Sequence, residues 1–270
     1  MNSPIPFDAA ASAERAALQQ RVVQALSNAL PPDCILWTPE DTVPYECDGL
    51  TAYRERPLVV ALPETEAQVQ AVLKTCHQLQ VPVVTRGAGT GLSGGAMPHR
   101  LGVTLSMARF NQIKTVDPVS RTAVVQCGVR NLAISEAAAP YGLYYAPDPS
   151  SQIACTIGGN VAENSGGVHC LKYGLTVHNI LRVRGFTAEG ERVEFGSEAL
   201  DAPGLDLLAL IESCGGRKRP LDTFAMALPL VWLFRRVAGE YAKSLSAQKV
   251  GNRFFGRNQR RASVQANGDI

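Results

Sequence analysis

The sequence lacks a long apolar run. The nearest candidate for a membrane span, Ala225–Phe234, contains Pro229 and is followed by Arg235 and Arg236, so it falls short of the roughly 18 uninterrupted apolar residues that a spanning helix needs. The N-terminus has neither a basic region nor a continuous apolar segment, so we predict no signal peptide. A hydrophobic content of 46% and a charged content of 19% are typical of a soluble globular protein.

Histidine is scarce and cysteine is unpatterned. The four histidines do not cluster with carboxylates, and the seven cysteines never form a C-x-x-C pair. This pattern argues against a disulfide framework and against a structural zinc site, so we predict no metal. It also favours a reducing cytoplasm. The cysteines are Cys34, Cys47, Cys76, Cys127, Cys155, Cys170 and Cys214.

Basic and acidic residues are unevenly distributed along the chain. Residues 1–210 carry 15 Lys and Arg against 20 Asp and Glu, a net charge of −5, whereas residues 211–270 carry 11 against 4, a net charge of +7. The two values sum to the overall +2. Such an asymmetry is informative about segments of different character.

The pattern of apolar residues predicts an α+β fold. Helices are indicated by apolar positions at helical spacing, and strands by short β-branched runs. The predicted helices are Ala11–Leu30, Thr65–Leu79 and Val129–Tyr141. The predicted strands are Pro57–Leu62, Val81–Thr85, Leu101–Ser106, Ile113–Val116 and Thr122–Gln126, followed by a hairpin of Ile180–Phe186 and Val193–Phe195.

A glycine-rich stretch, Arg86–Ala96, directly follows a predicted strand. Five of its eleven residues are glycine, which suggests a backbone that approaches an anion closely with several N–H groups. Gly89-x-Gly91-x-x-Gly94 also matches the Rossmann fingerprint, but that motif needs a helix directly after the glycines. Here a strand follows, so we reject the Rossmann interpretation. An ordinary surface loop remains the other alternative.

A second stretch of small residues, Pro147–Gly167, lies some 60 residues further on. Pro147 and Pro149 stiffen the backbone around Asp148, and the TIGGN segment at Thr156–Asn160 allows a ring or a phosphate to pass close to the chain. Two such stretches suggest one long ligand held at several points. A dinucleotide has that shape.

Together these motifs resemble the FAD-binding domain of the vanillyl-alcohol oxidase and p-cresol methylhydroxylase superfamily. The resemblance rests on RGAGTGLSGGA at Arg86–Ala96 and on PDPSSQIACTIGGNVAENSGG at Pro147–Gly167, and it covers about residues 35–210. Within the superfamily the chain is most similar to the D subunits of glycolate oxidases, a group that includes D-lactate and D-2-hydroxyglutarate dehydrogenases. The resemblance implies an FAD-binding domain of the p-cresol methylhydroxylase type, incomplete at its C-terminal edge and without the cap domain.

The resemblance also implies which residues bind FAD. The first stretch would wrap the pyrophosphate with backbone amides, and the second would lie along the flavin, its ribityl chain and the rest of the cleft. Since the first stretch contains no histidine, we expect FAD to be bound non-covalently. The predicted cofactor-binding residues are Arg86, Gly87, Ala88, Gly89, Thr90, Gly91, Leu92, Ser93, Gly94, Gly95, Pro147, Asp148, Ser150, Ser151, Thr156, Gly158, Gly159, Asn160, Asn164 and Gly167.

The residues after position 210 depart from the family pattern. The charge reverses, and the glycine turn and strand that relatives carry at this point are missing. We predict three parts: a helical lead-in at 1–53, the FAD-binding domain at 54–210, and a poorly ordered non-family tail at 211–270. A shifted reading frame is our favoured explanation of the tail. A divergent basic tail, with a surface helix within Met226–Leu245, is the alternative.

The resemblance implies flavin-dependent oxidation of a small 2-hydroxy acid, with glycolate converted to glyoxylate in a complex with other subunits, including an iron–sulfur subunit. The catalytic residues stay unknown because relatives carry them in the missing half, and we expect this chain alone to be inactive. His169 and His178 are the candidates for a role near the flavin. We predict no nucleic-acid partner and a cytoplasmic location, with peripheral membrane attachment through partner subunits as an option. A non-catalytic flavin-binding remnant and a degenerate protein without flavin remain as alternatives.

Overall fold

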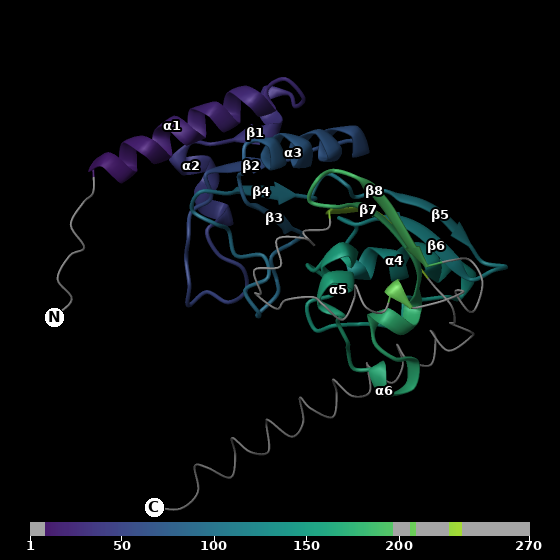
Figure 1. The fold of residues 1–270 in the computed structure, drawn as a ribbon. Coiled ribbons are helices and arrows are strands. Elements are labelled where there is room, and N and C mark those ends of the chain that lie inside the picture. The colour runs from purple at the N-terminus through teal and green to yellow at the C-terminus, as the bar shows by residue number, and fades with distance from the viewer. Residues whose placement is uncertain (1–8, 197–205, 209–226, 234–270) are drawn as a thin grey trace, which may run out of the picture.

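The computed structural model of the protein describes residues 9–196, 206–208 and 227–233 (Figure 1). These residues form two sheets with helices packed on them. The helices are α1 (Ala9–Leu26), α2 (Pro39–Thr42), α3 (Glu66–Gln78), α4 (Asn131–Ala138), α5 (Ile157–Glu163) and α6 (Cys170–Tyr173). The strands are β1 (Ile35–Leu36), β2 (Val59–Ala61), β3 (Val83–Arg86), β4 (Val103–Ser106), β5 (Ile113–Asp117), β6 (Thr122–Gln126), β7 (Ile180–Phe186), β8 (Arg192–Gly196) and β9 (Ala227–Leu233).

The first sheet has the strand order β1-β2-β4-β3. Both β2 and β3 run parallel to β4, which lies between them, and β1 pairs antiparallel with β2. The crossover from β2 to β3 is α3, which lies over this sheet beside α1 in Figure 1. It begins at a capping box, in which Thr65 and Gln68 satisfy each other's backbone N–H groups.

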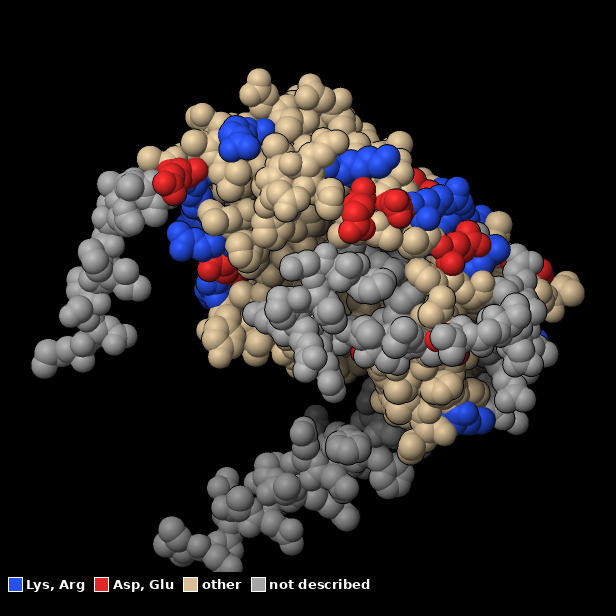
Figure 2. Space-filling model, in the orientation of Figure 1, with Lys and Arg blue, Asp and Glu red and all other residues tan. Residues whose placement is uncertain are grey.

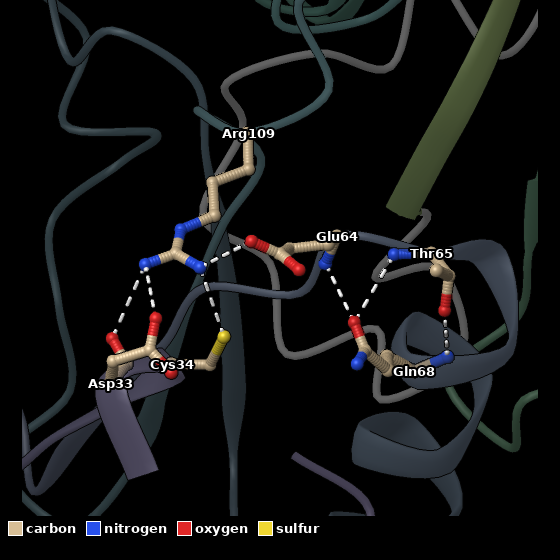
Figure 3. Close-up of polar contacts among 6 residues, drawn as sticks. All are labelled: Asp33, Cys34, Glu64, Thr65, Gln68 and Arg109. Atoms are coloured by element: carbon tan, nitrogen blue, oxygen red, sulfur yellow. Dashed lines mark hydrogen bonds and ion pairs between the residues drawn. The ribbon is translucent and has the colours of Figure 1, made fainter. Parts of the chain in front are cut away.

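Arg109 joins three segments around the first sheet that lie far apart in the sequence (Figure 3). Its guanidinium contacts the Asp33 carboxylate at 3.1 Å, the Glu64 carboxylate at 2.5 Å and the Cys34 sulfur at 3.1 Å. The hydrogen bonds to Asp33 and Glu64 raise the pKa of Arg109 above its ordinary value. The lead-in before β2 is thereby attached to the loop that leaves β4.

The second sheet is antiparallel, with the strand order β5-β6-β9-β7-β8. The predicted hairpin is confirmed, because β7 and β8 pair from Arg182↔Gly196 to Phe186↔Arg192. Gly190 makes the turn with a φ of +80°, a conformation that side chains other than glycine rarely adopt. The other predicted strands are confirmed, with bounds that differ by at most two residues.

Strand β9 comes from the part of the chain that lacks the family pattern, and it lies in the middle of this sheet. Val231 stands opposite Val125 of β6 and Val183 of β7. Pro229, which has no N–H to donate, lies where the pairing with β7 shifts register, and its pairing with β6 begins only at Leu230. A bulge is the place where a sheet tolerates proline. A surface helix within Met226–Leu245 is therefore wrong over 227–233, and the rest of that range lies outside the described residues.

Several helical regions differ from the prediction: α1 ends at Leu26 and not at Leu30, and the short helices α2 and α6 were not predicted. The predicted helix Val129–Tyr141 is shorter, since α4 spans Asn131–Ala138 and a 3-10 turn follows it. Helix α5 was not predicted, because glycines at positions 158 and 159 disfavour a helix. Tertiary contacts hold its start, where the N–H groups of Ile157 and Gly158 donate to the carbonyls of Val129 and Cys127 at 2.9 and 2.8 Å.

A single apolar core extends under both sheets. It includes Leu26 of α1, Leu73 of α3 and Leu105 of β4, and it continues to Val125 and Val183 of the second sheet. The halves are therefore packed as one unit. None of the helices in the described ranges is both long enough and apolar enough to cross a membrane.

Candidate functional site

The first glycine-rich stretch begins at the end of β3, where Arg86 is buried. Its guanidinium donates to the carbonyls of Cys47 at 2.8 Å and Ala96 at 3.4 Å, and it lies over the ring of Tyr45. Burial lowers the pKa of Arg86, and the negative charge of Asp48 acts in the opposite direction. The side chain therefore holds the two ends of the stretch together against the lead-in.

The backbone of this stretch has unused hydrogen-bond donors. Within the described residues, the amide N–H groups of Ala88–Gly95 donate to no acceptor of the protein, whereas those of Met97 and Gly102 are bonded at 3.2 and 2.8 Å. Gly89 and Gly94 adopt left-handed backbone conformations, with φ of +70° and +74°. A run of free amides in a turning backbone is the arrangement that binds phosphate groups.

The structure brings the two predicted stretches into contact at Gly87 and Thr156. A Cβ atom added to Gly87 would overlap the Thr156 hydroxyl, so the backbone of one stretch lies directly on a side chain of the other. The Thr156 hydroxyl is buried and has no hydrogen-bond partner among the described residues. An unpaired buried hydroxyl between two runs of small residues is the feature expected where a polar ligand supplies the missing partner.

A buried amide network attaches the second stretch to the fold. The Asn131 side chain, fully buried at the start of α4, donates to the Pro147 carbonyl and to Asn160 Oδ1, both at 2.9 Å. Asn160 in turn contacts Ser165 at 3.4 Å. Sequence analysis missed Asn131, although a polar residue on the buried side of an otherwise alanine-rich helix was the available signal.

Four glycines of the two stretches divide into two kinds. Gly158 lies against Cys127 and Gly167 lies against Asp148, so that an added Cβ would meet protein atoms at once. Gly91 and Gly159 differ, since the nearest atoms to an added Cβ are 3.8 and 3.5 Å away. The first kind permits close packing of the protein, and at the second an added Cβ would make only ordinary van der Waals contacts. The amides of the first stretch without a partner among the described residues and the unpaired Thr156 hydroxyl fit the phosphate groups of a dinucleotide.

The other predicted residues lie in the same region with different tasks. Pro147 is buried, with its carbonyl bonded to Asn131, whereas Ser150 is exposed. Asp148 accepts hydrogen bonds from His169. Asn164 ends α5 in a left-handed conformation, and its Oδ1 accepts the Val177 N–H at 3.0 Å. The assignment of the full set to a cofactor stays a prediction.

Charged residues of both signs alternate over the described surface on the face drawn in Figure 2. Within the described ranges, His, Cys, Asp and Glu do not gather in groups of three or more that could hold a metal ion. Cys76 and Cys127 lie in the core, and burial raises the pKa of each thiol to about 12. The backbone amides of the first stretch and the unpaired Thr156 hydroxyl of the second are therefore the chemically distinctive groups among the described residues.

Comparison with known families agrees with this geometry. The family described as an FAD binding domain matches residues 57–196, more than half of the 270-residue chain. The match begins just before β2 and ends with β8. It thus includes both stretches that meet at Gly87 and Thr156.

Curated relatives cover the same part of the chain. The glycolate oxidase subunit GlcD of Escherichia coli is 64% identical over 195 residues, which are 72% of this chain and 39% of that protein. A D-lactate dehydrogenase of Archaeoglobus fulgidus is 36% identical over 159 residues, which are 58% of this chain and 35% of that protein. The chain therefore spans less than half the length of these relatives.

Solved structures share the fold. A p-cresol methylhydroxylase with bound substrate superimposes with a TM-score of 0.65 at 21% sequence identity, covering 81% of this chain and 43% of that one. At this identity the likeness concerns the fold alone. The expected architecture, a p-cresol methylhydroxylase-type domain with mixed helices and strands, is confirmed.

Proposed function

The chain belongs to the family of FAD-binding domains, and from this premise we propose that it is the FAD-binding part of a flavin-dependent 2-hydroxy-acid oxidoreductase that oxidises glycolate to glyoxylate. The observation that carries the proposal is the meeting of two small-residue stretches at Gly87 and Thr156, beside the free amides of Ala88–Gly95. The substrate assignment is supported by the 64% identity to the Escherichia coli subunit.

The two stretches divide the task of holding FAD. The amides of the first stretch neutralise the pyrophosphate, and the second stretch, held by Asn131, supports the flavin and its ribityl chain. When bound, FAD accepts a hydride equivalent from the α-carbon of the hydroxy acid. The contribution of this chain is to bind the cofactor, to orient it and to set its electrostatic surroundings. We expect the binding to be non-covalent, because Arg86–Ala96 contains no histidine.

A second candidate is a D-lactate or D-2-hydroxyglutarate dehydrogenase of the same family. It is supported by the similarity to the D-lactate dehydrogenase of Archaeoglobus fulgidus, which is weaker than that to the glycolate oxidase subunit. A third candidate is a remnant that binds flavin without catalysing a reaction. Since this chain spans 39% of the Escherichia coli subunit, we propose that it does not oxidise glycolate by itself. We further propose that it acts with other subunits, including an iron–sulfur subunit, in the cytoplasm or at the inner face of the membrane.

A chimera tests the proposed activity. Residues 57–196 of this chain replace the matching residues of the Escherichia coli subunit, and glycolate-dependent dye reduction is compared with that of the parent complex. We expect FAD content and glycolate oxidation to be retained. A flavin-loaded chimera that is inactive with glycolate and active with D-lactate would favour the second candidate, and one inactive with every 2-hydroxy acid would favour the remnant. A Gly158→Ala chimera is the control that should lose FAD.

The division of the chain into 1–53, 54–210 and 211–270 is likewise a proposal. The family match ends at residue 196, and the charge reverses after residue 210. We propose a shifted reading frame for the tail, even though its residues 227–233 pair in the second sheet. Resequencing codons 205–220 and translating all three frames tests this. A family-like strand and cap domain in another frame would support the shift, and their absence in every frame would overturn it.

A further inference from the structure

His169 lies outside the predicted cofactor-binding residues but is bonded directly to one of them. Asp148 Oδ2 lies 2.7 Å from Nδ1 of the His169 ring, and Asp148 Oδ1 accepts the backbone N–H of His169 at 3.2 Å. Because both carboxylate oxygens bind the same residue, the imidazole ring is held in one orientation. With the proton on Nδ1 shared with Asp148, Nε2 is the nitrogen that exchanges a second proton.

The surroundings of this pair restrict its movement. The rings of Tyr144 and Tyr173 lie 6.5 and 6.4 Å from the His169 ring, and the two tyrosine rings are 6.0 Å apart. Gly167 lies directly on the backbone of Asp148. The His169 side chain is 37% exposed, and that of Asp148 is 14% exposed. The pair thus joins Pro147–Ser151 to the segment that ends at Gly167, and solvent protons still reach the imidazole.

We propose that His169 is a positioning residue whose protonation is coupled to reduction of the flavin, so that the domain takes up a proton when the cofactor becomes negatively charged. This rests on the proposed function, since it requires FAD beside the second stretch. When bound and reduced by two electrons and one proton, the flavin would carry one more negative charge than in its oxidised form. A second proton taken up at Nε2 of His169 would offset that charge.

The direction of the effect follows from Coulomb's law. A positive charge near the flavin favours the reduced anion and raises the reduction potential. Among the described residues, the charged or titratable groups recorded at the imidazole are the Asp148 carboxylate and the rings of Tyr144 and Tyr173; the Lys172 ammonium lies 5.0 Å from the centre of the Tyr173 ring.

The test is the pH dependence of the flavin reduction potential in the full chain loaded with FAD, measured by dye-equilibrated reduction with dithionite. A two-electron reduction that takes up one proton changes by about 30 mV per pH unit, and one that takes up two protons by about 60 mV. The reduced flavin itself takes up a second proton in acid, so the slope doubles there in every variant. We expect the doubled slope to extend to higher pH in the wild type and in the control His77→Gln, which removes an exposed histidine on α3. We expect His169→Gln to confine the doubled slope to the acid range that the flavin alone produces.

A fixed positive charge separates electrostatics from structure. We expect His169→Lys to keep the higher potential but to lose the extension of the doubled slope to higher pH, and His169→Gln to lose both. If His169 is merely structural, the variants will differ from the wild type in thermal stability and FAD affinity while the slope stays unchanged, which would overturn the inference. A doubled slope that covers the same pH range in the wild type as in His169→Gln would also overturn it. Failure of the wild-type chain to bind FAD would instead overturn the proposed function, so the two failures are distinguishable.

Discussion

The contact between Gly87 and Thr156 gives a sharp prediction about how the two stretches fit together. A Cβ at position 87 would overlap the Thr156 hydroxyl, whereas the next nearest atoms, Thr156 Cβ and the Gly159 amide nitrogen, are 3.8 Å away. Overpacking of a buried contact costs about 1–3 kcal/mol. We therefore expect Gly87→Ala to lower the free energy of unfolding by about that amount, because nothing except Thr156 is in the way.

Removal of the Thr156 hydroxyl should reverse the sign of the effect of Gly87→Ala on the free energy of unfolding. In a Thr156→Ala background the overlap is gone, and Gly87 has no left-handed backbone conformation to protect. Gly→Ala at a compatible position stabilises a protein by about 0.4–1 kcal/mol through the unfolded state. We expect Gly87→Ala to be neutral or stabilising there. In a Thr156→Val background, which keeps the bulk of the side chain, it should stay destabilising.

Urea unfolding followed by circular dichroism measures the coupling in this double-mutant cycle. FAD affinity should follow the same pattern, because the contact lies at the junction of the predicted cofactor residues. If Gly87→Ala changes stability by less than about 0.5 kcal/mol in the wild-type background, or if Thr156→Val rescues it as well as Thr156→Ala, then the two stretches are not in contact as described.

Three further predictions concern other parts of the fold. Val231→Pro should destabilise the chain by about 1–3 kcal/mol, because β9 has a neighbour on each side and proline leaves a backbone group of the sheet unpaired. The control is Lys114→Pro, which lies at the bulge of edge strand β5. Equal unfolding midpoints for the two variants would contradict the placement of β9. Iodoacetamide should modify the partly exposed Cys47 and Cys170 before Cys76 and Cys127, because burial raises the pKa of the latter two thiols to about 12. Mass spectrometry measures the order of modification, and equal rates at Cys127 and Cys47 would contradict the prediction. Hydrogen bonds from Ser120 and from the Val119 amide lower the pKa of Asp117 below its ordinary 3.8. The stabilisation by its carboxylate is therefore present above pH 3.8 and is lost as the pH falls through the lower folded-state pKa. Asp117→Asn should flatten the acid side of the plot of unfolding free energy against pH, and an unchanged plot would contradict this prediction.

Most of the regular structure was predictable because local pattern and tertiary structure agree. The strands β2–β8 are short β-branched runs, and α3 has its buried Val72 and Leu73 at helical spacing. The contact between the two stretches was expected in outline, since a long ligand had to be held by both. The prediction that a strand and not a helix follows the first stretch was also confirmed, since the chain between Arg86 and Val103 contains no helix, which excludes the Rossmann interpretation.

What escaped prediction depends on contacts between distant residues. Helix α5 contains two glycines and begins only because carbonyls of Cys127 and Val129 accept its first N–H groups. The role of Asn131 depends on Pro147 and Asn160, which no local pattern connects to it. Strand β9 contains a proline and follows a segment without the family pattern, so only its pairing with β6 and β7 identifies it.

The central claim is that this chain holds FAD in the cradle formed by the two stretches. The most direct measurement is the flavin content of the purified full chain after saturation with FAD and removal of the excess, with Gly167→Ala as a matched variant whose Cβ would overlap Asp148. We predict an equimolar amount of FAD on the wild type, released to the supernatant by acid precipitation, and little on the variant. A folded wild-type chain that retains no FAD would contradict the account.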